Sequence, residues 1–168
     1  MIDRGALVVL TREGETYRGA HRTPLDGAPF TGRKGKALGR RYTDAVIAGN
    51  GVLEDLDDAI ELCREARAIG IDCEVIVFEV PQTPYVPGAL PVVDAPPAEG
   101  LSLLGWDVIE PIEPWDSPLA KSTELPPGLN ANGLFATRRE AESFAASANA
   151  TEASDEPRAA ARVWLSEV

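Results

Sequence analysis

The sequence is short of the residues from which most catalytic and metal sites are built. It has one histidine, His21, and two cysteines, Cys63 and Cys73, ten positions apart. Catalytic triads and imidazole-based metal sites need more than this unless His21 itself is the base, and two isolated thiols fit neither a zinc knuckle nor a disulfide scaffold. We therefore identify no catalytic residue, metal site or cofactor, and we expect both thiols to be small buried groups in a reducing compartment.

Long apolar runs are also missing. Nowhere do the roughly 18 consecutive apolar residues of a membrane-spanning helix occur. The apolar run Ala6–Leu10 is too short for the core of a signal peptide, and charged residues follow it. We expect a cytoplasmic protein.

Charge is plentiful but unevenly distributed. The net charge is −11, yet residues 1–41 carry nine basic and four acidic residues, whereas residues 42–168 carry seven basic and 23 acidic ones. The N-terminal part thus has a net charge of +5 and the remainder −16. The acidic total argues against nucleic acid and anionic membranes as partners, and it favours a basic protein partner.

Hydrophobic patterning predicts a single α+β domain spanning residues 1–168. We expect a mostly antiparallel sheet of four or five strands, packed against two main helices, with long Pro/Gly-rich loops. One helix starts after Asp55 and ends at Gly70, and a capping-box sequence at Thr137 starts the other. A short helix at 42–49 is a further expectation. The predicted strands are two strands of an N-terminal hairpin (6–10 and 15–21) and three central strands (73–80, 102–109 and 160–167). We expect the strand at 160–167 to be half-buried.

The basic run of the N-terminal part lies between glycines and prolines, which predicts a solvated loop over residues 23–41. It does not fit a Walker phosphate loop, because no Ser or Thr follows a Gly-Lys pair at the required spacing. One hypothesis is nevertheless a small enzyme or anionic-ligand-binding domain that uses this loop. Its ligand-binding residues would be His21, Arg33, Lys34, Lys36, Arg40 and Arg41.

An acidic segment with a central tryptophan follows the predicted strand 102–109. Trp115 stands among Glu110, Glu113 and Asp116, and Asp107 precedes them. An exposed aromatic ring among carboxylates has the composition of a binding hot spot for a basic partner. The alternative is that Trp115 folds back to fill the core beneath its own loop.

Other roles for the carboxylates remain open. Neighbouring pairs such as Asp57 and Asp58 can act as acid and base in glycoside hydrolysis only where two carboxyl groups face each other across a cleft. A nucleic-acid mimic would instead place its carboxylates in regular rows on one face. An acidic chain supplies such pairs by chance, so hydrolysis is not favoured, and the nucleic-acid mimic stays open as a third possibility.

Three stretches together resemble a known group of proteins. These are the strand Leu103–Val108, the loop Ser117-Pro118-Leu119, and the turn Gly128–Phe135 that leads into the capped helix. They resemble small bacterial immunity-type proteins of polymorphic toxin systems, a likeness to which Val163-Trp164-Leu165 adds. The resemblance implies a non-enzymatic inhibitor, and our leading hypothesis is that it presents the acidic segment Glu110–Asp116 to a basic toxin domain.

Overall fold

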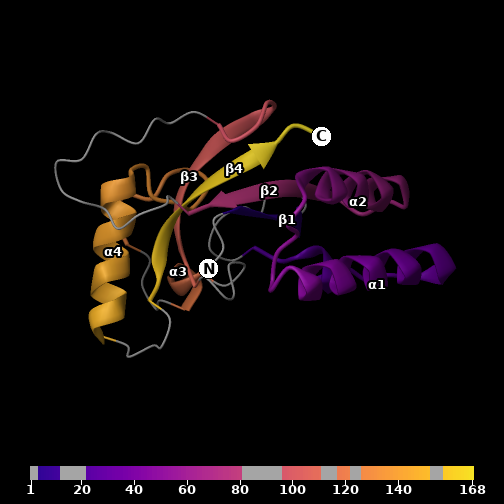
Figure 1. Ribbon diagram of the computed structural model, residues 1–168, viewed down its shortest axis with the longest axis horizontal. Helices are drawn as coiled ribbons and strands as arrows, with labels where there is room; N and C mark the ends of the chain where they lie inside the picture. The colour runs from indigo at the N-terminus through magenta and orange to yellow at the C-terminus, as the bar shows by residue number, and fades with distance from the viewer. Residues whose placement is uncertain (1–3, 12–21, 81–95, 111–116, 122–125, 152–156) are drawn as a thin grey trace.

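The computed structural model describes residues 4–11, 22–80, 96–110, 117–121, 126–151 and 157–168 (Figure 1). Its strands are β1 (Arg4–Leu10), β2 (Cys73–Glu79), β3 (Leu101–Ile109) and β4 (Ala159–Ser166). Its helices are η1 (Leu25–Gly27), α1 (Gly32–Ala48), α2 (Leu56–Ala68), α3 (Pro118–Lys121) and α4 (Arg138–Thr151). The return strand of the predicted hairpin, 15–21, lies outside the described residues.

The four strands form one antiparallel sheet in the order β1-β2-β4-β3, which confirms the α+β prediction. Strands β2 and β4 are central, but β3 lies at the edge of the described sheet, so its predicted central position is wrong. Strand β3 is nevertheless buried, because segments outside the sheet cover it. The backbone of Trp106 exchanges two hydrogen bonds of 2.8 Å with Phe135, and α4 packs over β3 and β4.

Strand β3 also contains a bulge that only glycine can form. The register with β4 shifts between Leu103 and Gly105, and Gly105 has a φ of 145°. A Cβ atom there would lie 2.8 Å from the side chain of Leu134 and 2.9 Å from the carbonyl oxygen of Phe135. Because backbone and side-chain atoms both block that position, residue 105 must be glycine for the 128–135 turn to pack on the strand.

Helices α2 and α4 begin where the sequence predicts. The Asp55 carboxylate accepts a 2.8 Å hydrogen bond from the amide of Asp57 at the start of α2. At α4, the Glu140 carboxylate accepts hydrogen bonds from the amide and hydroxyl groups of Thr137, and the Thr137 hydroxyl accepts one from the Glu140 amide. These reciprocal bonds form the predicted capping box.

Helix α1 occupies residues 32–41 of the loop expected at 23–41, so the loop prediction is wrong for that part. Its N-terminal half is the basic run, and its C-terminal half is the short helix expected at 42–49. The buried face consists of Gly35, Leu38, Gly39 and Tyr42. A Cβ atom on Gly39 would lie 2.6 Å from the Phe30 ring, so glycine lets the helix pack closely over that ring. The helix therefore forms through packing, despite the low helix propensity of its glycines.

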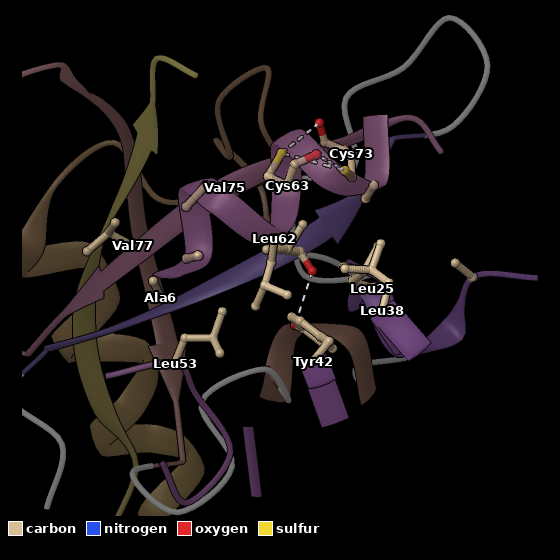
Figure 2. Close-up of a cluster of buried hydrophobic side chains, with 14 of the residues drawn as sticks. Ala6, Leu25, Leu38, Tyr42, Leu53, Leu62, Cys63, Cys73, Val75 and Val77 are labelled. Atoms are coloured by element: carbon tan, nitrogen blue, oxygen red, sulfur yellow. Dashed lines mark hydrogen bonds between the residues drawn. The ribbon is translucent and has the colours of Figure 1, made fainter. Parts of the chain in front are cut away.

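The helices gather at two ends of the sheet, with α1 and α2 at one end and α4 at the other (Figure 1). The core beneath α1 and α2 includes Leu38, Tyr42, Leu62, Cys63 and Val75 (Figure 2). The core beneath α4 joins Trp106 and Val108 of β3 to Ala160 of β4. Strand β4 is buried on both faces rather than half-buried, because Arg162, Trp164 and Ser166 are covered as well as Ala161 and Val163.

Candidate functional site

Asp107, expected to support partner binding, is completely buried in the fold. Its Oδ2 accepts a 2.6 Å hydrogen bond from Nη1 of Arg22, whose side chain is equally buried. Its Oδ1 accepts 2.7 Å hydrogen bonds from the Ser117 hydroxyl and from the Val108 amide. Both carboxylate oxygens are thus engaged within the chain, and Asp107 has an internal structural role in place of the expected one at a surface.

The described residues on either side of positions 111–116 make contacts within the fold. Ser117, at the downstream end, is held by Asp107, and Glu110, at the upstream end, lies 3.5 Å from Nη2 of Arg158. Glu110 is only partly exposed, so part of its charge is offset by the buried Arg158. Glu113, Trp115 and Asp116 lie outside the described residues.

The structure places the basic candidates on one helix, α1, where all five side chains are exposed: Arg33, Lys34, Lys36, Arg40 and Arg41. Lys34 and Arg41 lie on the same side of the helix as Leu38, because they are four and three positions from it. Arg41 forms a 2.7 Å ion pair with Glu65 of α2. Among the described residues, the other four cations have no carboxylate within ion-pair distance. His21 is outside the described residues.

Two adjoining hollows lie between the start of α1 and the end of α2, and we call them together the α1–α2 groove. The first, of about 290 Å³, is lined by Phe30, Arg33, Lys34, Ile69 and Ile71 among others. The second, of about 420 Å³, is lined by Lys34, Leu38, Arg41, Glu65 and Ile69 among others. Lys34 and Ile69 line both hollows, so these form one continuous surface.

The groove combines an apolar floor with a cationic rim. Phe30, Ile69 and Ile71 supply the apolar surface, and the Ile69 side chain is 42% exposed although it is large and apolar. Arg33 and Lys34 border the first hollow, and Arg41 borders the second. The pKa of Arg41 is raised because it hydrogen-bonds to the Glu65 carboxylate, so this guanidinium keeps its charge. The arrangement suits a ligand that has both carboxylates and apolar groups.

The first turn of α1 breaks the usual rules for a helix start. Thr31 makes no capping hydrogen bond with its side chain, and the turn contains no acidic residue. Arg33, Lys34 and Lys36 instead place positive charge beside the positive end of the helix dipole, where cations are unfavourable. Such a local conflict is typical of residues that serve binding rather than stability.

The apolar half of the groove was not predicted from the sequence. Ile69 and Ile71 flank Gly70 in the turn after α2, and Phe30 precedes α1 in a segment interpreted as loop. One available signal was the pair of isoleucines around a helix-ending glycine, in a position where turns are usually polar. The cations were identified as candidates, but the loop interpretation of residues 33–41 hid the fact that one helix carries them.

Metal and membrane sites receive no support in the described part of the chain. No group of three or more potential metal ligands of the His, Cys, Asp or Glu type occurs there. None of the described helices combines the length and hydrophobicity that crossing a membrane needs. Comparison with protein-family models, with curated proteins and with solved structures finds no match for this chain.

Proposed function

We propose that this chain is a non-enzymatic binding protein whose α1–α2 groove takes an acidic, partly apolar peptide segment of a partner protein. The observation that carries the proposal is the groove itself, where Arg33 and Lys34 stand beside exposed Ile69. Carboxylates of the segment pair with the two cations, and an apolar side chain covers Ile69. Desolvated apolar anchors beside charge pairs are typical of binding hot spots.

The overall charge decides among the anionic ligands that such a surface attracts. Nucleic acids and anionic membranes present many charges over a long distance, and a chain with a net charge of −11 repels them outside the basic helix face. A short peptide segment contacts only the groove, so the remaining acidic surface opposes it less. The two joined hollows also form an extended surface that suits a chain-like ligand.

The test uses a fluorescently labelled synthetic peptide in which glutamates alternate with leucines. We expect the double variant Arg33→Glu/Lys34→Glu to lower the affinity by about tenfold or more, equivalent to about 1.4 kcal/mol, as measured by fluorescence anisotropy. The matched control is Lys36→Glu/Arg40→Glu, which makes the same charge change on the same helix outside the residues that line the groove. Its affinity should fall by no more than about threefold.

Two results would count against the proposal that the groove binds the peptide. Equal losses in the two double variants would show that the peptide responds only to the net charge of α1. Failure of the wild-type protein to bind the peptide at millimolar concentration would remove the proposal. Vesicles of anionic phospholipid and a labelled single-stranded DNA serve as competing ligands, and tighter binding to either one would reassign the groove.

A second proposal retains the acidic segment Glu110–Asp116 as a binding surface for a basic partner, such as a toxin domain. The observation that favours it is that Glu110 and Ser117, which border positions 111–116, are bound to Arg158 and Asp107 respectively. In an immunity-type protein, this segment would inhibit the partner by covering its basic site.

The two proposals respond to different substitutions. Binding of a basic partner should weaken in a Glu113→Lys/Asp116→Lys variant and should be unchanged in Arg33→Glu/Lys34→Glu. Its association rate should also fall as ionic strength rises, because opposite charges steer the encounter. An association rate that is independent of salt would exclude the electrostatic mechanism.

A further inference from the structure

Cys63 and Cys73 meet inside the core, although no sequence pattern predicted that they would be neighbours. Cys63 lies on α2 and Cys73 opens β2, and their sulfur atoms are 3.5 Å apart (Figure 2). Each thiol also lies within hydrogen-bonding distance of the other residue's carbonyl oxygen, at 3.6 and 3.7 Å. Both are free thiols and both are buried. A disulfide needs a sulfur–sulfur distance of about 2.0 Å, so the two atoms are about 1.5 Å from bonding.

We propose that Cys63 and Cys73 are an oxidation site that forms a reversible disulfide, and that this bond clamps the wall of the α1–α2 groove. The segment between the cysteines holds one side of that groove. Glu65, Ala68, Ile69 and Ile71 all line it, and all four lie between residues 63 and 73. A covalent link at the base of this segment restricts its movement relative to β2.

Cys63 is the thiol that reacts first. The hydrogen bond from Cys73 lowers the pKa of the Cys63 thiol, and the positive charge of Arg67 acts in the same direction, whereas burial opposes both. The hydrogen bond with Cys63 raises the pKa of the Cys73 thiol, and burial raises it further. Arg67 is held in place by a 2.9 Å hydrogen bond from its Nε to the carbonyl oxygen of Cys73. The thiolate is the reactive form, so the geometry makes Cys63 the nucleophile and Cys73 the resolving thiol.

Hydrogen peroxide is an oxidant small enough to reach buried thiols through local opening of the end of α2. The Cys63 thiolate attacks one peroxide oxygen, breaks the O–O bond and becomes a sulfenic acid, and the released hydroxide takes up a proton to become water. The sulfur of Cys73 then attacks the sulfur of Cys63, loses its proton and displaces a second water. Two thiols and one peroxide thus give one disulfide and two waters, and an added dithiol reverses the reaction.

The bond is tested on the full chain with peroxide, intact mass spectrometry and a thiol count in denaturant. We expect the wild-type protein to lose the mass of two hydrogens and both thiols while staying monomeric, and dithiothreitol to restore them. The Cys73→Ser variant should instead gain one oxygen that dimedone traps on Cys63. Wild-type protein that keeps both thiols, or that gains oxygen as the variant does, overturns the proposal, and the wild-type result decides even if the variant does not fold.

The clamp rests on the proposed function, so it has a separate measurement. We expect the oxidised protein to bind the glutamate–leucine peptide about threefold or more tightly than the reduced protein, because a fixed groove wall loses less entropy on binding. Equal affinities of the two forms overturn the clamp. Absence of peptide binding in both forms counts against the proposed function, whereas the mass and thiol measurements still decide whether the bond forms.

Discussion

Charged residues are used in opposite ways in the β3–β4 half of the molecule and on helix α1. In the first region three arginines are buried and paired: Arg22 with Asp107, Arg158 with Glu110, and Arg162 with Glu79. On α1 the cations are exposed, and only Arg41 has an ion-pair partner among the described residues. The first set of charges is used by the fold, and the second remains available to a ligand.

The difference shows why net charge alone is a poor guide to the binding surface. The acidic total of the chain directs attention to its carboxylates, yet Asp107 is inaccessible and Glu110 is partly offset by Arg158. Buried ion pairs stabilise a fold only weakly against apolar replacements, but they are costly to break. Substitutions in the two regions should therefore separate stability from binding.

The largest expected effect is that of Asp107→Ala. Removing the carboxylate takes away the ion pair with Arg22 and the hydrogen bonds to Ser117 and Val108, all of which are buried. Breaking one partner of a buried ion pair costs about 3–5 kcal/mol of the free energy of unfolding. Urea denaturation followed by tryptophan fluorescence measures the loss.

A double variant sharpens this measurement. The Arg22→Met/Asp107→Leu protein removes both charges together and leaves apolar groups of similar volume beside Phe78, over whose ring the Arg22 guanidinium lies at 4.6 Å. We expect it to be more stable than Asp107→Ala, because no uncompensated charge remains buried. A double variant that is less stable than the single one would mean that the ion pair itself stabilises the fold.

The next effect concerns Tyr42, which lies on the buried face of α1. Its hydroxyl donates a 3.1 Å hydrogen bond to the carbonyl oxygen of Val8, so Tyr42→Phe should cost about 0.5–1.5 kcal/mol at neutral pH (Figure 2). Burial, together with the negative charge of Asp26, raises the pKa of Tyr42 well above its ordinary value. The folded protein thus holds this proton more tightly than the unfolded chain does.

The raised pKa fixes the sign of the pH dependence. The contribution of Tyr42 to stability is complete below about pH 10, the ordinary tyrosine pKa, and is lost as the pH rises toward the raised value. The wild-type protein should therefore lose more stability above pH 10 than Tyr42→Phe does. Urea midpoints at pH 8 and at pH 10.5–11 test this, and parallel losses in the two proteins would contradict it.

The sequence predicted those elements whose signals are local. Helix α2 follows from Asp55 at its cap and from apolar residues at spacings of three and four, and α4 follows from Thr137 and Glu140. The N-terminal half of α1 was missed because Gly35 and Gly39 were interpreted as loop residues. They lie on its buried face with Leu38 and Tyr42, where Phe30 and the core favour small residues. Tertiary packing therefore overrides helix propensity.

The candidate site was predicted only in part, for a related reason. Arg33, Lys34 and Arg41 could be identified as possible ligand contacts from charge alone. Ile69 and Ile71 join them through the packing of α1 on α2, between segments about thirty residues apart, and no local pattern encodes that contact. The burial of Asp107 was hidden in the same way, because its partner Arg22 lies 85 positions away.

Lys34→Glu should have a smaller effect on stability. It should stabilise the fold while it weakens peptide binding. A carboxylate in the first turn of α1 interacts favourably with the helix dipole, so this substitution should raise the free energy of unfolding by about 0.3–1 kcal/mol. The same substitution should weaken peptide binding. Urea denaturation and anisotropy on one protein sample measure both. A loss of stability would mean that Lys34 supports the fold, and the argument that its position serves binding would fail.

The smallest effect on stability is expected at the Arg41–Glu65 pair, which tests the comparison most directly. Its 2.7 Å separation nearly equals the 2.6 Å of Arg22–Asp107, but its side chains are 53% and 40% exposed, whereas those of the buried pair are fully covered. Water and salt screen the exposed pair, so Glu65→Gln should change stability by no more than about 0.5 kcal/mol.

The effect of Glu65→Gln on binding should be larger than its effect on stability. Glu65 lines the groove and accepts a hydrogen bond from Arg41. Its neutral replacement therefore removes a charge that repels the acidic peptide, and it leaves the Arg41 guanidinium available to pair with the peptide. We expect the affinity to rise by about threefold, with Glu61→Gln, on the same helix but outside the groove lining, as the matched control. A large loss of stability with unchanged affinity would place Arg41 and Glu65 among the charges used by the fold, and the contrast between the two regions would then no longer hold.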